Sequence, residues 1–307
     1  MNLKNKSVLV TGGAGFIGSR LVIKLVEKGY SVKVLDNLSR GSIDQILPLI
    51  KSGHVEFING DIRHKDVVDN AMKGVDYVFH EAATNINRSI KYPGESFDIN
   101  FNGSYVVFKS AQDHNVKKVL FASSDSVYGQ PKVLPMREDA TLSPITPYCI
   151  CKLSSEYLLR CLDLKFIIFR YFNVYGVGQR VDAYYTSVIN NFQKNLLNGD
   201  PPVIVGKGDQ SMDFVHVNDI VNANILGLES YVENEIFNVG SGVSTTVRDL
   251  AYKLIKLMDK QVDPIFSPRE VIVDTRRADI QKIHEFLGFI PEITLEEGLL
   301  EIVGGLI

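Results

Sequence analysis

The chain has 307 residues, of which 45% are hydrophobic and 22% charged, and its formal net charge at pH 7 is −3. This composition is that of an ordinary globular protein, and the length suits one large domain or two closely joined ones. No run of Lys and Arg exceeds two residues, which argues against a broad nucleic-acid surface. Because no apolar run approaches the roughly 20 residues that span a bilayer, we expect a soluble cytoplasmic protein with neither a membrane nor a nucleic-acid partner.

The cysteines limit metal and disulfide chemistry. Cys149, Cys151 and Cys161 are odd in number, lie on one predicted helix and have no clustered histidines beside them. We therefore expect no metal site, and buried thiols in a reducing compartment. Residues 2–6 lead directly into a strand-like run, so we also expect no secretory signal.

The first half of the chain alternates short apolar runs with helix-length segments. The helical segments include 16–29 and 104–114, where apolar residues recur at spacings of three and four. Continuous apolar strands alternating with helices predict a parallel sheet covered on both faces, the doubly wound α/β (Rossmann) class, with right-handed crossovers. The predicted strands are 7–12, 31–36, 54–58, 75–82, 117–123 and 165–172.

After Phe172 this alternation stops. A loop over 173–183 precedes a helix at about 184–199, a turn-rich stretch with one short strand, and a strand and helix over 214–230 that return to the first domain. A strand near 235–240 and a helix near 245–258 follow, and the remainder is expected to be irregular. We predict a Rossmann domain of residues 1–172 plus about 211–235. A smaller α/β substrate domain would comprise about 173–210 plus 236–307.

The first predicted strand ends in TGGAGFIG, at the start of a helix. Gly12 permits a tight turn, Gly15 lets a diphosphate approach the backbone, and Gly18 lets the helix pack closely on the sheet. Asp36 ends the second strand, where a carboxylate hydrogen-bonds a ribose diol and repels a 2′-phosphate. The sequence therefore predicts a dinucleotide site that takes NAD, although Arg40 nearby is a residue that would suit NADP.

The segment PYCICK places Tyr148 and Lys152 four residues apart, on one side of a helix. A free phenol has a pKa of about 10 and is a poor base at neutral pH. A neighbouring ammonium favours the phenolate and brings the pKa toward the working range. Joined to the glycine cradle and to a serine upstream, this pair predicts a catalytic site.

Several motifs together resemble a known family. They occur in the order of the extended short-chain dehydrogenase/reductases, and the chain is most similar to NAD-dependent nucleotide-sugar epimerases of the UDP-galactose 4-epimerase type. The resemblance runs from Ser7 to about Leu299. The motifs are TGGAGFIG, DNLSRGS (36–42), GDI (60–62), HEAA (80–83), SSDSVYG (123–129), PYCICK (147–152), RYFNVYG (170–176), DFVHVNDI (213–220) and FNVGSG (237–242).

The resemblance implies residue roles. Ser124 would hydrogen-bond the sugar 4-oxygen, Tyr148 would be the base, and Lys152 would bind the nicotinamide ribose and lower the pKa of the tyrosine. For Asn100, a cap between loop and helix is an equally good explanation. Besides Gly12, Gly15, Gly18, Tyr148 and Lys152, the implied cofactor contacts are Phe16, Ile17, Asp36, Asn37, Ser39, Gly41, Ser42, Asp61, Ile62, Ala82, Ala83, Asn100 and Tyr171. The implied substrate contacts are Ser124, Asp125, Asn173, Val203, Arg269 and Arg276.

The chain departs from the family pattern around the substrate diphosphate and the hexose. Met212 stands where the family often has a diphosphate-binding arginine. Either Arg269 or another basic residue such as Arg180 compensates, or the affinity for the nucleotide is lower. Arg276 falls where a small residue or tyrosine usually lies near the hexose. It would either meet a charged sugar or simply fill the pocket.

Asp125 bears on the choice of reaction. The 4,6-dehydratases of the family carry an Asp–Glu pair here, in which the Asp protonates the leaving hydroxyl and the Glu removes the C5 proton. In this chain the second position is Ser126, so elimination is disfavoured and Asp125 is expected to touch the hexose hydroxyls.

We therefore expect an NAD-dependent UDP-sugar 4-epimerase, which inverts C4 through a transient 4-keto sugar. A 4,6-dehydratase, a decarboxylase, a 4-ketosugar reductase and a non-enzymatic NAD-binding regulator remain open. By the resemblance, helices at about 93–114 and 148–162 would pair into a four-helix bundle in a homodimer. The nucleotide base and the hexose are not determined by the sequence.

Overall fold

A seven-stranded parallel sheet forms the centre of the protein. The computed structural model describes residues 6–179, 188–268 and 275–305. The sheet has the strand order β10-β6-β5-β4-β1-β2-β3, and all neighbouring strands are parallel. The strands are β1 (Ser7–Thr11), β2 (Ser31–Asp36), β3 (Val55–Asn59), β4 (Tyr77–His80), β5 (Lys118–Ser124), β6 (Phe166–Tyr171) and β10 (Glu235–Val239). The predicted doubly wound α/β class is confirmed.

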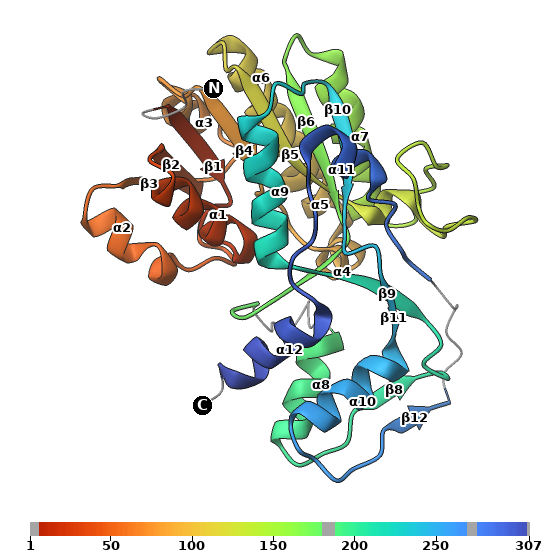
Figure 1. Ribbon diagram of the computed structural model, residues 1–307. Helices are drawn as coiled ribbons and strands as arrows, with labels where there is room; N and C mark the ends of the chain where they lie inside the picture. The colour runs from red at the N-terminus through yellow and green to blue at the C-terminus, as the bar shows by residue number, and fades with distance from the viewer. Residues whose placement is uncertain (1–5, 180–187, 269–274, 306–307) are drawn as a thin grey trace.

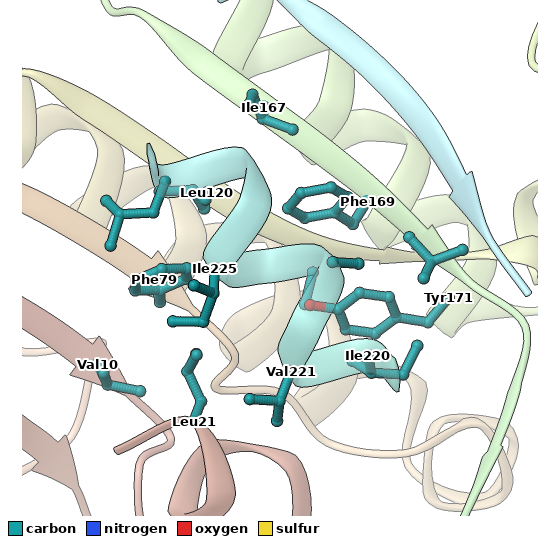
Figure 2. Packing of buried hydrophobic residues seen from close by; sticks show 14 of the residues in the cluster. Val10, Leu21, Phe79, Leu120, Ile167, Phe169, Tyr171, Ile220, Val221 and Ile225 are labelled. Atoms are coloured by element: carbon teal, nitrogen blue, oxygen red, sulfur yellow. The ribbon is translucent and has the colours of Figure 1, made fainter. Parts of the chain in front are cut away.

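Helices cover both faces of this sheet because side chains alternate along each strand. Val8 and Val10 of β1 join the core on one face, whereas Leu9 joins the core on the other. The first core packs against α1 (Phe16–Glu27) and α9 (Val217–Glu229). Figure 2 shows Ile220, Val221 and Ile225 of α9 packed over side chains of β4, β5 and β6. The second core packs against α3 (Lys65–Met72), α6 (Ser104–Asp113) and α7 (Pro147–Cys161).

Shorter helical segments connect these elements. The chain between β4 and β5 forms α4 (Ile86–Lys91), α5 (Pro93–Ser96) and a π-helical segment, η2 (Phe97–Gly103), which continues into α6. Three further short pieces are η1 (Ile43–Gln45), α2 (Leu47–Lys51) and η3 (Asp125–Tyr128). In the part of the chain that the structure describes, no helix combines the length and apolar character needed to cross a membrane.

A second group of elements lies below the central sheet in Figure 1. It contains a three-stranded sheet of β11 (Ser244–Thr246), β9 (Ser211–His216) and β7 (Asn173–Tyr175), and a two-stranded sheet of β12 (Ile265–Ser267) and β8 (Val203–Val205). A third apolar core joins β7, β8 and β9 to three helices. The helices are α8 (Val188–Leu197), α10 (Val247–Leu257) and α12 (Leu295–Gly304).

The structure differs from the expected boundaries in two strands. β10, expected in the smaller domain, pairs with β6 at the edge of the central sheet, where Phe237 and Val239 enter the first core. β9, expected in the Rossmann domain, pairs instead with β7 and β11. The division of the chain into two domains stays a prediction.

The C-terminal segment is also more regular than expected. It contains α11 (Gln281–Leu287), which packs beside β10, and α12. A capping box starts α12, since Thr294 accepts a hydrogen bond from the backbone of Glu297 and the Glu297 side chain accepts one in return.

A buried ion pair joins the central strands beneath the cavity. Arg170 of β6 donates through Nε and Nη2 to the two carboxylate oxygens of Glu156 of α7, at 3.0 and 2.7 Å. Both side chains are at most 3% exposed. Arg170 also donates to the hydroxyl of Tyr128 in η3, at 2.9 Å, and Ser123 of β5 donates to Glu156. One guanidinium therefore connects β6, α7, β5 and η3.

We predict that Arg170→Met lowers the free energy of unfolding by about 3–5 kcal/mol, because it leaves the Glu156 carboxylate buried without its cation. Denaturant titration measures this change. Arg137→Met is the matched control, since the Arg137–Asp139 pair is exposed, and it should leave stability nearly unchanged. Equal effects of the two substitutions would contradict the structural role of the buried pair.

Candidate active site

Two connected cavities lie at the carboxyl ends of the central strands. The larger has a volume of about 690 Å³ and the smaller about 250 Å³. Both are lined by Gly12, Gly15, Arg40, Gly41, Glu81 and Ala83, so they form one continuous cleft. Ligands of doubly wound sheets bind at this edge.

The cleft brings most of the predicted site residues together. Some of the predicted residues line only one of the two cavities. Those that line only the larger cavity are Phe16, Ile17, Gly18, Ser42, Ser124, Asp125, Tyr148, Tyr171, Asn173 and Arg276. The smaller is lined by Asp36, Asn37, Ser39, Asp61, Ile62 and Ala82. The predicted cofactor residues therefore extend from one cavity into the other, while the predicted catalytic and substrate residues gather in the larger one.

Three predicted residues do not line the cleft, and a fourth falls outside the described residues. Lys152 is buried behind the wall of the larger cavity. Asn100 is also buried, and its side-chain oxygen accepts from the backbone N–H of Thr84 at 2.7 Å, so it connects η2 to the loop after β4, and cofactor contact stays a prediction. Val203 lies on β8 and is 45% exposed, outside the residues that line the cleft. Arg269 falls outside the described residues, as does Arg180.

The glycine loop after β1 requires glycine at two positions. Gly12 has φ +72°, and a Cβ there would lie 2.7 Å from the backbone nitrogen of Ala82. A Cβ on Gly18 would lie 2.2 Å from the carbonyl oxygen of Gly12. The N-cap of α1 is Gly15, which supplies no side-chain cap. The first N–H groups of α1 therefore point into the cleft as donors for an anion.

Two carboxylates in the smaller cavity differ in their partners. Asp36 accepts from the backbone N–H groups of Ala14 and Leu38, at 3.0 and 2.8 Å, and its burial raises its pKa. Asp61 accepts from Arg63 and Asn37, and the hydrogen bond from the Arg63 guanidinium lowers its pKa. Because these two donors to Asp36 are backbone N–H groups and not cations, the carboxylate suits the recognition of a ribose diol.

The start of α7 sets the geometry of the Tyr–Lys pair. Thr146 caps the helix by accepting from the backbone of Cys149, and Pro147 follows in the first turn. Tyr148 and Lys152 then lie on one side of the helix, with the lysine Nζ 5.8 Å from the centre of the tyrosine ring. The Nζ donates to the carbonyl of Ala122 at 2.6 Å.

The lysine is the buried cation of the site. It is 3% exposed, and burial lowers its pKa to about 8, while the charges of Glu81, Cys151 and Glu156 oppose this shift. At neutral pH its ammonium is still the predominant form. It lies close enough to the Tyr148 ring to favour the phenolate electrostatically.

Ser124 and Asp125 lie where β5 ends. The Ser124 hydroxyl donates to Asp125 at 3.3 Å and accepts from the backbone of Ser126 at 3.2 Å. Asp125 also forms an ion pair with Arg276, whose Nη1 lies 3.0 Å from Oδ2, with side-chain exposures of 15% for the arginine and 11% for the aspartate. Arg276 donates in addition to the carbonyl of Gly129 at 2.8 Å. Asp125 is therefore held by a cation, and the predicted Arg276 does reach the larger cavity.

Other expectations have mixed outcomes. His80 has a structural role, since it is buried with hydrogen bonds to Thr11 and Ser104. The expectation of buried thiols holds for Cys149 and Cys151 but is wrong for Cys161, which is exposed near the end of α7. Met212 packs against the third apolar core and does not line the cleft.

The sequence interpretation missed Glu81. It lines both cavities, and the hydroxyl of Tyr171 donates to its carboxylate at 2.9 Å. The signal was a charged residue directly after an apolar strand in the HEAA motif, of which only the alanines were interpreted.

Comparison with known proteins identifies the family. A family model described as "NAD dependent epimerase/dehydratase family" matches residues 8–240. The chain belongs to this family.

Relatives of different activity match nearly the whole chain. A protein of Methanocaldococcus jannaschii, provisionally named a UDP-glucose 4-epimerase, is 38% identical over 96% of this chain and 97% of its own. The UDP-N-acetyl-alpha-D-glucosaminuronate decarboxylase of Bacillus cytotoxicus is 33% identical over 97% of each chain. The structure of a UDP-N-acetylglucosamine 4-epimerase from Methanobrevibacter ruminantium, in complex with UDP-N-acetylmuramic acid, superimposes with a TM-score of 0.92 at 34% identity, over 98% of each chain.

The cleft fits the cofactor of the NAD-dependent epimerase/dehydratase family. The glycine loop leaves no room for a Cβ at Gly12 or Gly18, the N-terminus of α1 offers unpaired donors for the diphosphate, and Asp36 lies in the cavity at the end of β2. Asp36 in the smaller cavity, the glycine loop at the junction and Tyr148 in the larger cavity thus lie in the order that ribose, diphosphate and nicotinamide require.

We predict that Lys152→Met raises the free energy of unfolding at neutral pH, in the absence of cofactor, by about 1–3 kcal/mol. The pKa of this lysine is about 8 in the folded protein and about 10.4 in an unfolded chain. The folded protein therefore binds this proton less tightly than the unfolded chain does. Below about pH 8 the charged lysine destabilises the folded state, and this destabilisation disappears as the pH rises through the pKa of the lysine in the unfolded chain. Loss of the hydrogen bond to Ala122 offsets part of the gain.

Denaturant titrations at two pH values, near neutrality and above the unfolded pKa, measure this difference. Lys109→Met, which changes an exposed lysine, is the control and should show no such gain. A Lys152→Met variant less stable than the wild type at neutral pH would contradict the account.

Proposed function

We propose that this protein is an NAD-dependent UDP-sugar 4-epimerase, which inverts C4 of a UDP-hexose through a transient 4-keto sugar. The observation that supports this most directly is the larger cavity itself. Ser124 and Tyr148 line it together, and Lys152 lies buried within 5.8 Å of the tyrosine ring centre. A base, its activating cation and a hydroxyl that binds the reacting oxygen thus meet beside the predicted cofactor cleft.

The proposed roles follow from these positions. Tyr148, as phenolate, removes the proton of the sugar 4-hydroxyl and later returns it. Lys152 favours the phenolate, and Ser124 hydrogen-bonds the 4-oxygen. Bound NAD supplies the chemistry of accepting a hydride from C4 and returning it. Between the two transfers the 4-keto sugar turns its other face, so the nucleotide must be held firmly while the hexose is held loosely.

The ion pair of Asp125 favours epimerisation over 4,6-elimination. A general acid must carry a proton to give, whereas Asp125 is held 3.0 Å from the guanidinium of Arg276, which favours the carboxylate. Its neighbour Ser126 offers no carboxylate to remove the C5 proton. We infer that Asp125 binds and orients the hexose rather than protonating a leaving group.

Arg276 supports one alternative, a carboxylate-bearing sugar. It lines the larger cavity, and guanidinium–carboxylate pairing is among the stronger polar interactions. A UDP-uronic acid epimerase or decarboxylase would use such a group, and a decarboxylase of a UDP-uronic acid is among the relatives.

We also propose a homodimer. Exposed Phe97, Tyr105, Ile150 and Tyr157 lie on η2, α6 and α7, and η2 and α7 pack against each other. These apolar side chains supply the surface that a four-helix bundle of two copies would cover.

We predict that Tyr148→Phe lowers the rate of C4 inversion by about 10²–10⁴-fold and leaves NAD binding intact, because only the proton-transfer group is removed. Proton NMR of the protein with NAD and, separately, UDP-glucose, UDP-N-acetylglucosamine, UDP-glucuronic acid and dTDP-glucose should show a new anomeric signal for one C4 epimer. Tyr231→Phe, which changes an exposed tyrosine, should match the wild type. A 6-methyl doublet, or full activity of Tyr148→Phe, would contradict the proposal.

We predict that Arg276→Ala shifts the ratio of kcat/KM between UDP-glucuronic acid and UDP-glucose about tenfold toward the neutral sugar, since it removes a cation that lines the larger cavity beside Asp125. Steady-state kinetics with both sugars measure the ratio. Arg277→Ala is the matched control, because this neighbouring arginine lines a separate surface groove. An unchanged ratio in Arg276→Ala would mean that the arginine only fills space.

A further inference from the structure

We propose that Glu81 is a positioning residue that supplies the counter-charge for the oxidised nicotinamide, and that it takes up a proton when the reduced cofactor binds. This inference rests on the proposed function and deepens it, because an epimerase must keep its cofactor in both redox states within one cleft.

The position of Glu81 places it beneath any bound dinucleotide. It follows β4, and its backbone N–H donates to the carbonyl of Thr11 at 3.1 Å, which extends the pairing of β4 with β1. Its side chain lines both cavities at their junction, together with Gly12 and Gly15. A dinucleotide that reaches from Asp36 in the smaller cavity to Tyr148 in the larger one must pass this carboxylate.

A chain of hydrogen bonds fixes the carboxylate from behind. Asn224 of α9 donates to the hydroxyl of Tyr171 at 2.7 Å, and Tyr171 donates to Glu81 at 2.9 Å. The Asn224 amide also donates to the carbonyl of Ile220 at 2.8 Å. Asn224 and Tyr171 are both buried, and both hydrogen bonds run in one direction, toward Glu81. The carboxylate is thus held as an acceptor.

Among the described residues, Tyr171 is the only hydrogen-bond donor to the Glu81 side chain, and no lysine or arginine forms an ion pair with it. The nearest cationic influence is Lys152, whose charge opposes the effect of burial. Burial raises the pKa of Glu81 to about 7, although the hydrogen bond from Tyr171 and the charge of Lys152 both lower it. A carboxylate so placed lacks a full counter-charge within the protein.

Two other titratable groups around Glu81 keep one charge state near neutral pH, whereas Lys152 loses its charge at somewhat higher pH than Glu81. His80, on the same strand, has its pKa lowered to about 3 by burial and stays neutral. Burial raises the pKa of Tyr171 well above its usual value. Lys152 of α7, with a pKa of about 8, titrates on the alkaline side. Tyr148 and Arg40 face the same cleft from α7 and from the loop after β2.

The charge of the cofactor ring then couples to the proton on Glu81. The oxidised nicotinamide is a cation and favours the ionised carboxylate, whereas the reduced ring is neutral and favours the protonated one. Binding of NADH should therefore bring a proton from solvent onto Glu81, and binding of NAD should release one. By linkage, the preference for NAD over NADH rises with pH through the pKa of Glu81.

The test compares the dissociation constants of NAD and NADH, by calorimetry on protein freed of bound nucleotide, at pH values on both sides of about 7, the pKa of Glu81. In the wild type the preference for NAD should increase about tenfold from the acid to the alkaline side, the effect of one nearby charge at about 1.4 kcal/mol. Glu81→Gln keeps an acceptor for Tyr171 and should bind both nucleotides with a smaller, pH-independent preference. Calorimetry in two buffers of different ionisation enthalpy should show proton uptake with NADH in the wild type and none in the variant.

Two further variants separate this role from a structural one. Tyr171→Phe removes the hydrogen bond that holds down the pKa of Glu81, so the midpoint of the pH dependence should move upward. Glu138→Gln changes a half-buried carboxylate whose pKa is also raised but which lies outside both cavities, and it should leave the dependence unchanged.

An unchanged NAD-to-NADH ratio in Glu81→Gln would overturn the inference, as would a wild type that binds neither nucleotide. No sugar is present in this test. If the protein inverts C4 but Glu81→Gln leaves the NAD-to-NADH ratio unchanged, this inference alone is overturned. If the ratio changes as expected but no UDP-sugar is turned over, the proposed function alone is overturned.

Discussion

The buried Arg170–Glu156 pair is the interaction on which the geometry of the site depends. Each carboxylate oxygen of Glu156 accepts from the guanidinium, so the end of α7 that follows Lys152 is fixed against β6. The same guanidinium holds η3 through Tyr128, and η3 begins directly after Ser124. Tyr148, Lys152 and Ser124 are therefore aligned by one cation that does not line the cavity. Such a pair contributes little net stability but leaves few alternative arrangements once it is formed.

The cleft itself contains opposite charges that are each incompletely compensated. Burial moves the pKa of Lys152 down to about 8 and that of Glu81 up to about 7, so both groups are held in states that a well-paired core would avoid. Asp125 and Arg276, in contrast, compensate each other at 3.0 Å. The part of the cleft around Glu81 and Lys152 is thus electrostatically strained, and the part around Asp125 and Arg276 is closer to neutral. Strain of this kind is expected where a bound group completes the charge balance.

The sequence predicted what depends on local spacing and missed what depends on distant contacts. The residues of the glycine loop lie within a few positions of one another, and so do Tyr148 and Lys152. Turn geometry and helix geometry therefore suffice to place the members of each group. The Arg276–Asp125 pair joins residues 151 positions apart and the Glu81–Tyr171 bond joins residues 90 apart, which no local pattern encodes. The placement of β10 at the edge of the central sheet is likewise a distant pairing. The helix α12 is a different case, since its capping box was visible in the sequence but was not interpreted.

The most direct test of the account follows deuterium from C4 of the sugar. UDP-glucose, or whichever UDP-sugar of the panel is turned over, would be deuterated at C4 and incubated with the protein and NAD in ordinary water. If C4 is inverted through hydride transfer to a cofactor that stays bound, mass spectrometry and NMR should find the label at C4 of both epimers, with no loss to solvent. Label at C6 of a 6-deoxy product, or release of label into water, would contradict the assignment as a 4-epimerase.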